Sequence, residues 1–233
     1  AAAIALLVLS VWLALTVVNN GTKRVVADNL NKITVDLPDG GTIVILNRNS
    51  TLTYPSKFKD DIRVVELEGE AFFDVASDGI KPFLVKTGMA EIKVLGTSFN
   101  VIAGNIDNET EIFVESGRVE VKNLGTDEVL TLEKGTIGIL SETSSKTKIN
   151  TDVNYTAWST ETLRYEGTEL RKVFQDIKRV YGAEISAAND SIYDFPLSTD
   201  FYNQPVELVI RIICVTFNLD YIEVDNEYIL SLK

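Results

Sequence analysis

The central part of this 233-residue chain is a succession of short apolar clusters that turn-forming residues separate. β-Branched and aromatic residues dominate the clusters, and no useful stretch of helical periodicity interrupts them. Glycine marks many of the separators, as at Ser116-Gly117 and Lys134-Gly135. The ten clusters are 43–46, 64–67, 71–75, 83–85, 92–95, 99–102, 112–114, 119–121, 129–132 and 137–140. The pattern predicts an all-β domain at 31–140, built as a sandwich or as a solenoid-like stack of coils.

An apolar run precedes that region. Residues 1–18 contain only Ser10 and Thr16 as polar interruptions, and Lys23 and Arg24 follow shortly afterwards. About eighteen residues, each rising about 1.5 Å, nearly cross a bilayer core, so we expect a transmembrane helix at 1–20. A secretory signal segment and a buried core helix are the alternatives. The first lacks a basic start and a cleavage site, and the second does not fit a run that is apolar on every face.

A polar segment follows the β-rich region. Residues 141–157 are rich in Ser, Thr, Lys and Asn and contain no apolar cluster. Such composition predicts a linker, mobile and exposed, between two separately folded parts.

The last part of the chain, 158–233, has a different periodicity. Residues 168–181 place apolar side chains at helical spacing and end at Gly182, and a second helix begins near Pro205. One constant offset superimposes the two apolar patterns, and a strand precedes and follows each helix. We therefore expect a small α+β domain of two β-α-β units, in which 225–226 turns the last strand back into a hairpin.

The composition excludes several kinds of chemistry. The chain has no histidine, so histidine-based zinc or haem sites and Ser-His-Asp or Cys-His catalysis are impossible. Its single cysteine, Cys214, lies in an apolar helical stretch, and a net charge of −12 argues against a nucleic-acid partner. Glu66, Glu68 and Glu70 alternate along one strand and could form a carboxylate pair for sugar hydrolysis, but a solvated strand face explains them better. We predict no catalytic residues, no cofactor and no metal.

Several strings in the β-rich region are distinctive. They are Leu37-Pro38-Asp39-Gly40-Gly41-Thr42, Leu46-Asn47, Gly69-Glu70-Ala71-Phe72-Phe73-Asp74-Val75 and Leu95-Gly96-Thr97-Ser98-Phe99-Asn100-Val101. With them the region strongly resembles the periplasmic domain of FecR-type transmembrane regulators, the anti-sigma and sensor proteins of TonB-linked signalling, especially the Bacteroidetes form. From Tyr155-Thr156-Ala157-Trp158 onwards, the chain is similar to the short N-terminal domain of secretins and TonB-dependent receptors.

The resemblance implies a single-pass inner-membrane protein with most of this chain in the periplasm. It implies a relay in which a TonB-dependent outer-membrane transporter contacts the periplasmic part. The signal then controls an extracytoplasmic-function sigma factor through a cytoplasmic segment ahead of residue 1. An exported carbohydrate-binding or adhesion module without a signalling role is the alternative function.

Exposed strand edges are the expected contact sites, because an unpaired edge can bind a partner strand through backbone hydrogen bonds. The candidate residues are Phe195, Leu197, Thr199, Tyr228, Leu230 and Leu232. The distinctive strings are expected to be mainly structural. We expect core positions at Phe72, Leu95, Phe99 and Val101.

Overall fold

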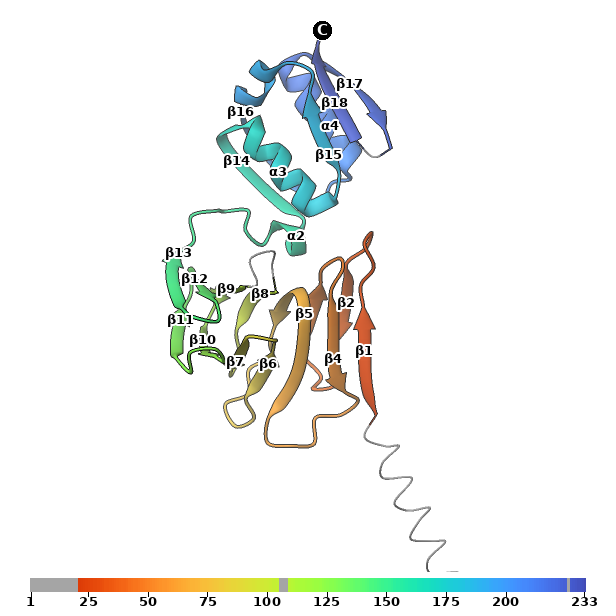
Figure 1. Ribbon diagram of the computed structural model, residues 1–233. Coiled ribbons are helices and arrows are strands. Elements are labelled where there is room, and N and C mark those ends of the chain that lie inside the picture. Colours follow the sequence, from red (N-terminus) through yellow and green to blue (C-terminus); the bar gives the residue numbers. More distant parts are fainter. Residues whose placement is uncertain (1–20, 105–108, 226) are drawn as a thin grey trace, which may run out of the picture. The chain divides into compact units, whose positions relative to one another are not determined.

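The computed structural model describes residues 21–104, 109–225 and 227–233 (Figure 1). The chain divides into two compact units, the β-unit up to residue 150 and the C-terminal unit at 151–233. The transmembrane helix predicted at 1–20 lies outside the described residues. Within the described ranges, no helix combines the length and apolarity that a membrane crossing requires.

The strands of the β-unit form one continuous 13-stranded sheet. They are β1 (Thr22–Val26), β2 (Ile33–Asp36), β3 (Ile43–Leu46), β4 (Thr51–Pro55), β5 (Arg63–Asp74), β6 (Phe83–Lys86), β7 (Ala90–Val94), β8 (Ser98–Ala103), β9 (Thr110–Ser116), β10 (Arg118–Asn123), β11 (Val129–Glu133), β12 (Thr136–Leu140) and β13 (Ser145–Ile149). Because β1 and β13 join this sheet, the all-β region extends beyond the predicted bounds 31–140 at both ends.

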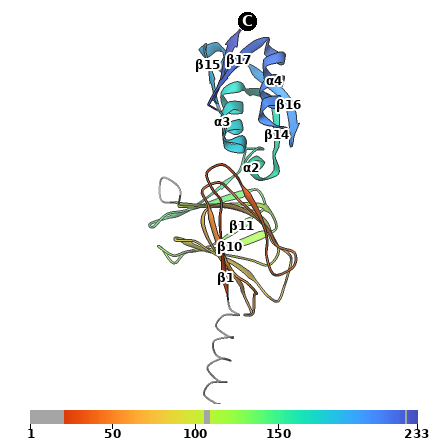
Figure 2. The ribbon, with the colours of Figure 1, turned by 90° about the vertical axis from the view of Figure 1, so that its right-hand side faces the viewer.

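Two layers of the sheet share the long strand β5. Its first half pairs with β4 and β6, in the layer β1-β4-β5-β6-β7-β10-β11. Its second half pairs with β3 and β8, in the layer β2-β3-β5-β8-β9-β12-β13. Figure 2 shows the layers from the side, and one buried apolar cluster draws its residues from both. The all-β prediction is confirmed, and two facing layers match its sandwich form rather than a stack of coils.

Gly69 is the point at which β5 passes from one layer to the other. The clusters 64–67 and 71–75, which the sequence presents as two strands, are halves of this one strand. Gly69 has φ +88°, a conformation that side-chain-bearing residues rarely adopt. A Cβ at this position would also lie 2.8 Å from Cβ and 2.9 Å from Cα of Ser50. The bend therefore requires glycine for two separate reasons.

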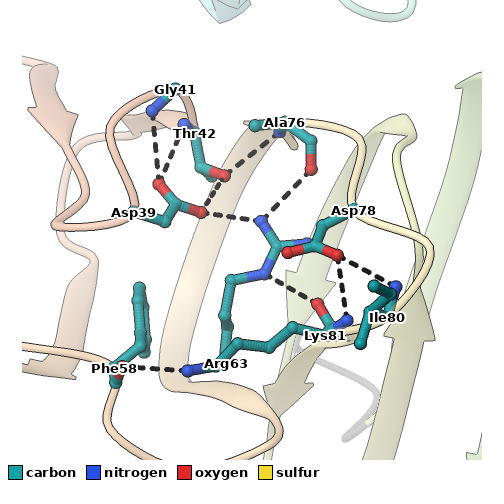
Figure 3. Close-up of polar contacts among 9 residues, drawn as sticks. All are labelled: Asp39, Gly41, Thr42, Phe58, Arg63, Ala76, Asp78, Ile80 and Lys81. Carbon is teal, nitrogen blue, oxygen red and sulfur yellow. Dashed lines mark hydrogen bonds and ion pairs between the residues drawn. The ribbon is translucent and has the colours of Figure 1, made fainter.

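A buried arginine joins the start of β5 to two loops, 37–42 and 75–82 (Figure 3). Arg63 is 2% exposed, and its Nη1 donates to Asp39 Oδ2 at 2.7 Å and to the carbonyl of Ala76 at 3.1 Å. Its Nε donates to the carbonyl of Lys81 at 3.0 Å. A planar guanidinium can hold several acceptors in fixed directions, so Arg63 sets the relative positions of these loops.

Asp39, in the Leu37-Pro38-Asp39-Gly40-Gly41-Thr42 string, receives further hydrogen bonds from its own turn. Thr42 donates its backbone N–H at 3.0 Å and its hydroxyl at 2.6 Å, and that hydroxyl accepts the N–H of Ala76 at 3.1 Å. Burial acts to raise the pKa of Asp39, but the hydrogen bonds from Thr42 and Arg63 outweigh it, so the pKa is lowered from 3.8.

Residues of three other distinctive strings meet around Glu70. Asn47 and Asn100 donate their side-chain N–H groups to the two oxygens of the Glu70 carboxylate, at 2.7 and 3.0 Å. The Glu70 backbone N–H donates to the hydroxyl of Ser50 at 2.8 Å. Asn100 is fully buried, so this network fixes the pairing of β3, β5 and β8 from the inside.

The expected core is confirmed in part. Phe99 and Val101 are fully buried, and the ring of Phe99 stacks on that of Phe73 with centroids 5.1 Å apart. Phe72 is half-buried, because strand alternation turns Phe73 inward instead. Leu95 is 48% exposed, so its assignment to the core was wrong. It follows the inward-facing Val94 at the end of β7 and therefore lies on the opposite side.

The C-terminal unit contains a two-stranded and a three-stranded sheet. Its elements are α2 (Ala157–Thr160), β14 (Thr162–Glu169), α3 (Leu170–Tyr181), β15 (Glu184–Ala187), η1 (Asp190–Asp194), β16 (Pro196–Tyr202), α4 (Val206–Phe217), β17 (Leu219–Val224) and β18 (Glu227–Leu232). Strands precede and follow α3 and α4, as the two-fold β-α-β pattern predicts. Helix α3 packs against strands of both sheets.

The segment predicted as a linker, 141–157, is largely structured. Residues 145–149 form β13, which pairs along its whole length with β12. Asn154, Thr156 and Ala157 are buried in the C-terminal unit. The mobile polar tether was therefore a wrong prediction: polar side chains here pair with backbone and with other polar groups, which a search for apolar clusters does not detect.

Replacing Gly69 with alanine should destabilise the β-unit more than the same change at Gly135. Both residues have φ above +80°, but a Cβ at Gly135 would meet nothing within 4 Å. We expect Gly135→Ala to cost about 1 kcal/mol through backbone strain alone. Gly69→Ala should cost about 2 kcal/mol more, because Ser50 must also move. Urea unfolding monitored by circular dichroism measures both, and equal losses would contradict the packing argument.

The Asp39 carboxylate should contribute to stability above pH 4 and lose that contribution in acid. Its pKa is lowered in the folded state, so the stabilisation is present above the unfolded value of 3.8 and disappears as the pH falls through the folded value. Asp39→Asn should therefore lower stability at neutral pH and flatten its fall in acid. Asp36→Asn, at an exposed position in β2, is the control. Parallel acid profiles for Asp39→Asn and the unmodified chain would refute this role.

Candidate functional site: open strand edges of the C-terminal unit

The two sheets of the C-terminal unit leave several strand edges without a strand neighbour. β14 and β16 pair antiparallel with each other and with no other described strand. In the three-stranded sheet, β18 lies between β15 and β17. The edges at issue are thus those of β14, β15, β16 and β17. Each exposes backbone groups unless a side chain covers them.

Asn154 covers the edge of β14. Its Oδ1 accepts the backbone N–H of Arg164 at 2.9 Å, and its Nδ2 donates to the Arg164 carbonyl at 3.0 Å. One side-chain amide thereby satisfies the two groups that an added strand would use. This pair of bonds, which we call the Asn154 clamp, closes β14 to a partner at this position.

A charge cluster around the buried Asp176 holds the clamp in place. Nδ2 of Asn154 also donates to Asp176 at 3.2 Å, and Asp176 is 5% exposed in α3. Lys172 forms ion pairs with Asp176 and, at 3.0 Å, with Asp152. Burial raises the pKa of Asp176, although the hydrogen bond from Lys172 opposes that shift. The residues that leave the β-unit are in this way anchored to α3.

Within the described part of the chain, the edge of β16 has no such cover at Asp200, although Gln204 donates its side-chain amide to the Tyr202 carbonyl at 3.3 Å. Arg164 lies opposite Asp200 in the β14–β16 pair, and its N–H and C=O both bond to Asn154 instead. The two residues therefore form a non-hydrogen-bonded pair, in which the N–H and C=O of Asp200 point away from β14. Asp200 and Tyr202 are exposed, and the Tyr202 hydroxyl donates to the Asp200 carboxylate at 2.6 Å. This edge offers backbone groups to a partner strand.

The predicted contact residues at 195–200 lie on or next to β16. Leu197 is buried and Thr199 is half-buried. Phe195 precedes the strand and packs its ring on Phe217, with centroids 5.3 Å apart. The strand's backbone, rather than these side chains, is its accessible part. Asp200 and Tyr202 are contact candidates that the sequence analysis did not name.

The prediction that β18 has an unpaired edge was wrong. Residues 227–230 pair in parallel with β15, and 227–232 pair antiparallel with β17. Tyr228 and Leu230 are buried, whereas Leu232 is 50% exposed. The hairpin was foreseen, but its last strand inserts between β15 and β17, so the open edge belongs to β17.

The C-terminal unit is acidic, and its one cysteine is buried. Acidic residues outnumber basic ones by 14 to seven in 151–233. Burial raises the pKa of the Cys214 thiol to about 11, which keeps it protonated and unreactive at neutral pH. Among the described residues, no group of three or more Cys, Asp or Glu side chains could hold a metal ion.

Removing the clamp should weaken the C-terminal unit and expose the β14 edge. Asn154→Ala loses both bonds to Arg164 and the bond to Asp176, so we expect a loss of about 1–3 kcal/mol. The Arg164 amide should also exchange its hydrogen faster. Val153→Ala is the control, because the neighbouring Val153 side chain is 78% exposed. It should change stability by no more than about 0.5 kcal/mol and leave hydrogen exchange at Arg164 unchanged. Unchanged exchange at Arg164 in Asn154→Ala would show that the clamp does not protect this edge.

Comparisons with known proteins agree with the architecture of both units. Residues 23–120 match the family model of the FecR protein, and residues 162–230 match that of the FecR C-terminal region. Two crystal structures of a candidate anti-sigma factor from Parabacteroides distasonis, at 1.65 and 2.50 Å resolution, are 32% identical to this chain, with TM-scores of 0.60. The matches cover 91% of this chain and 99% or 100% of those chains. No curated protein matches this chain. Matches to both family models and to a relative along nearly its whole length show that this chain belongs to the FecR family.

Proposed function

We propose that this chain is a regulator of anti-sigma type and that its described residues form the sensing part. Membership of the FecR family and the likeness to the Parabacteroides distasonis candidate anti-sigma factor support this role. The sensing part receives a signal from a TonB-dependent outer-membrane transporter. A segment ahead of residue 1 transmits it to an extracytoplasmic-function sigma factor.

The proposed location is the periplasm, with residues 1–20 as a single inner-membrane anchor. The apolar run at 1–18 supports the anchor, because its length and composition suit a bilayer core. The periplasmic side follows from the direction of the relay, since an outer-membrane transporter can reach only a domain beyond the inner membrane.

Docking of the transporter's signalling domain takes place in this proposal at the open edge of β16. The supporting observation is that the Asn154 clamp closes β14 while the N–H and C=O of Asp200 remain available on β16. Each added backbone hydrogen bond contributes about 1 kcal/mol net, so a short strand gives modest affinity. Micromolar binding, at about −8 kcal/mol, suits a relay that must reverse.

Two variants at one residue separate the backbone from the side chain. Asp200→Pro removes the outward N–H, whereas Asp200→Ala removes the carboxylate and keeps the N–H. Proline is tolerated at a strand edge when its position makes no ladder bond. We expect Asp200→Pro to weaken binding of the purified transporter signalling domain at least tenfold and Asp200→Ala by less than threefold. Equal effects of the two variants would contradict strand addition at β16.

A sigma-dependent reporter in cells tests the function itself. Deleting 151–233 should abolish the response to transporter substrate while the shortened chain stays in the membrane fraction. A normal response from that deletion would refute docking on the C-terminal unit. If the deletion abolishes the response but Asp200→Pro binds the transporter domain normally, the proposed function stands and the contact lies at another strand edge.

A further inference from the structure

The three-stranded sheet of the C-terminal unit has one buried and one exposed face. In β17 and β18, Leu219, Tyr228 and Leu230 are at most 2% exposed and lie on the face that the helices cover. Alternation along β17 places Asp220, Ile222 and Val224 on the opposite face, which we call the outer face. Ile222 is 60% exposed and Val224 is 54% exposed.

The apolar side chains of the outer face continue from β17 to the centre of the sheet. Ile222 lies directly opposite Ile229 of β18, which is partly exposed. Ile229 in turn lies opposite Ser186 of β15. β17 pairs with β18 alone among the described strands, so this apolar strip runs up to an open strand edge. Proteins that bind no partner rarely leave an edge strand with an apolar face exposed to solvent.

Acidic side chains lie on both faces of β17. On the outer face, Asp220 and Glu227 lie at the two ends of the strip, whereas alternation places Glu223 on the opposite face, and Asp225 follows in the turn. The one basic residue after 211 is Lys233, which lies 3.7 Å from Asp220. By contrast, the edge strand β13 of the β-unit carries Lys146 and Lys148, exposed and without a large apolar strip between them. Lysine on an edge deters strand addition, whereas β17 offers apolar side chains framed by negative charge.

This charge pattern indicates which kind of strand can pair with the open edge of β17. A second copy would bring the same four acids against these, and like charges opposite each other in a strand pair are destabilising. We propose that β17 accepts, as a fourth strand, an extended segment of another protein in which apolar side chains alternate with Lys or Arg. The apolar side chains of that segment continue the strip formed by Ile222 and Val224 on the outer face. Its basic side chains then lie on the opposite face of the sheet, where the exposed side chain of Glu223 can pair with them. This surface is separate from the β16 edge and does not depend on the docking proposed there.

A synthetic peptide tests the proposal on the full chain. The probe is a labelled peptide of about eight residues that alternates Val with Lys, and its matched control alternates Val with Glu. By fluorescence anisotropy, we expect the Val/Lys peptide to bind and its affinity to fall with added salt. The Val/Glu peptide should bind at least tenfold more weakly. Equal binding of the two peptides would overturn the charge argument.

Variants locate the site. Ile222→Thr with Val224→Thr keeps β-propensity while removing apolar surface, and it should weaken Val/Lys peptide binding at least tenfold. Val215→Thr, at a side chain of α4 that is 77% exposed, should leave binding unchanged, as should Asp200→Pro. Loss of binding in Asp200→Pro with retention in the double variant would place the peptide on β16 and refute the proposal. Self-association of the full chain that the double variant abolishes would make a second copy the occupant and would also refute it.

Discussion

The bend of β5 at Gly69 is the constraint on which the β-unit depends. One strand can belong to two layers only if its backbone turns sharply between them, and a positive φ achieves this here without breaking the ladders on either side. The space that a side chain would need is filled by Ser50, whose hydroxyl accepts the N–H of the next residue, Glu70. Ser50 therefore both occupies the space that only glycine leaves at the bend and stabilises the bend by a hydrogen bond.

The distinctive sequence strings converge on this arrangement, which explains why they combine glycine with buried polar residues. Glu70 follows the bend, and its carboxylate receives Asn47 from beyond β3 and Asn100 from β8. At the start of β5, the ion pair of Arg63 with Asp39 likewise fixes the position of a neighbouring loop. A buried polar group must find its partner, so such networks favour one strand order over others that would bury the same apolar area. The strings thus specify topology.

Elements that local periodicity determines could be predicted from the sequence. Helix α3 was expected at 168–181 and spans Leu170–Tyr181, because its apolar face and its terminal Gly182 are local signals. The inward face was harder to assign where two large apolar residues adjoin, as in Phe72-Phe73 and Val94-Leu95, because alternation allows only one of each pair to face the core. The insertion of β18 between β15 and β17 depends on a parallel pairing across some 40 residues, for which no local pattern exists. The strand at 196–202 was predicted, but the covering of the neighbouring β14 edge depends on Asn154, a polar residue in the segment that composition predicts to be a linker.

The Asn154 clamp also shortens the connection between the two units. Asn150 donates its backbone N–H to the carbonyl of Gly135 in the β-unit, and Asp152 forms its ion pair with Lys172 in the C-terminal unit. The polypeptide therefore passes from the hydrogen bonds of one unit to those of the other within about three residues. An insertion or deletion at 150–152 would therefore disturb either the pairing that holds β13 or the bonds that hold Asn154, because the residues on both sides of it already take part in a folded unit.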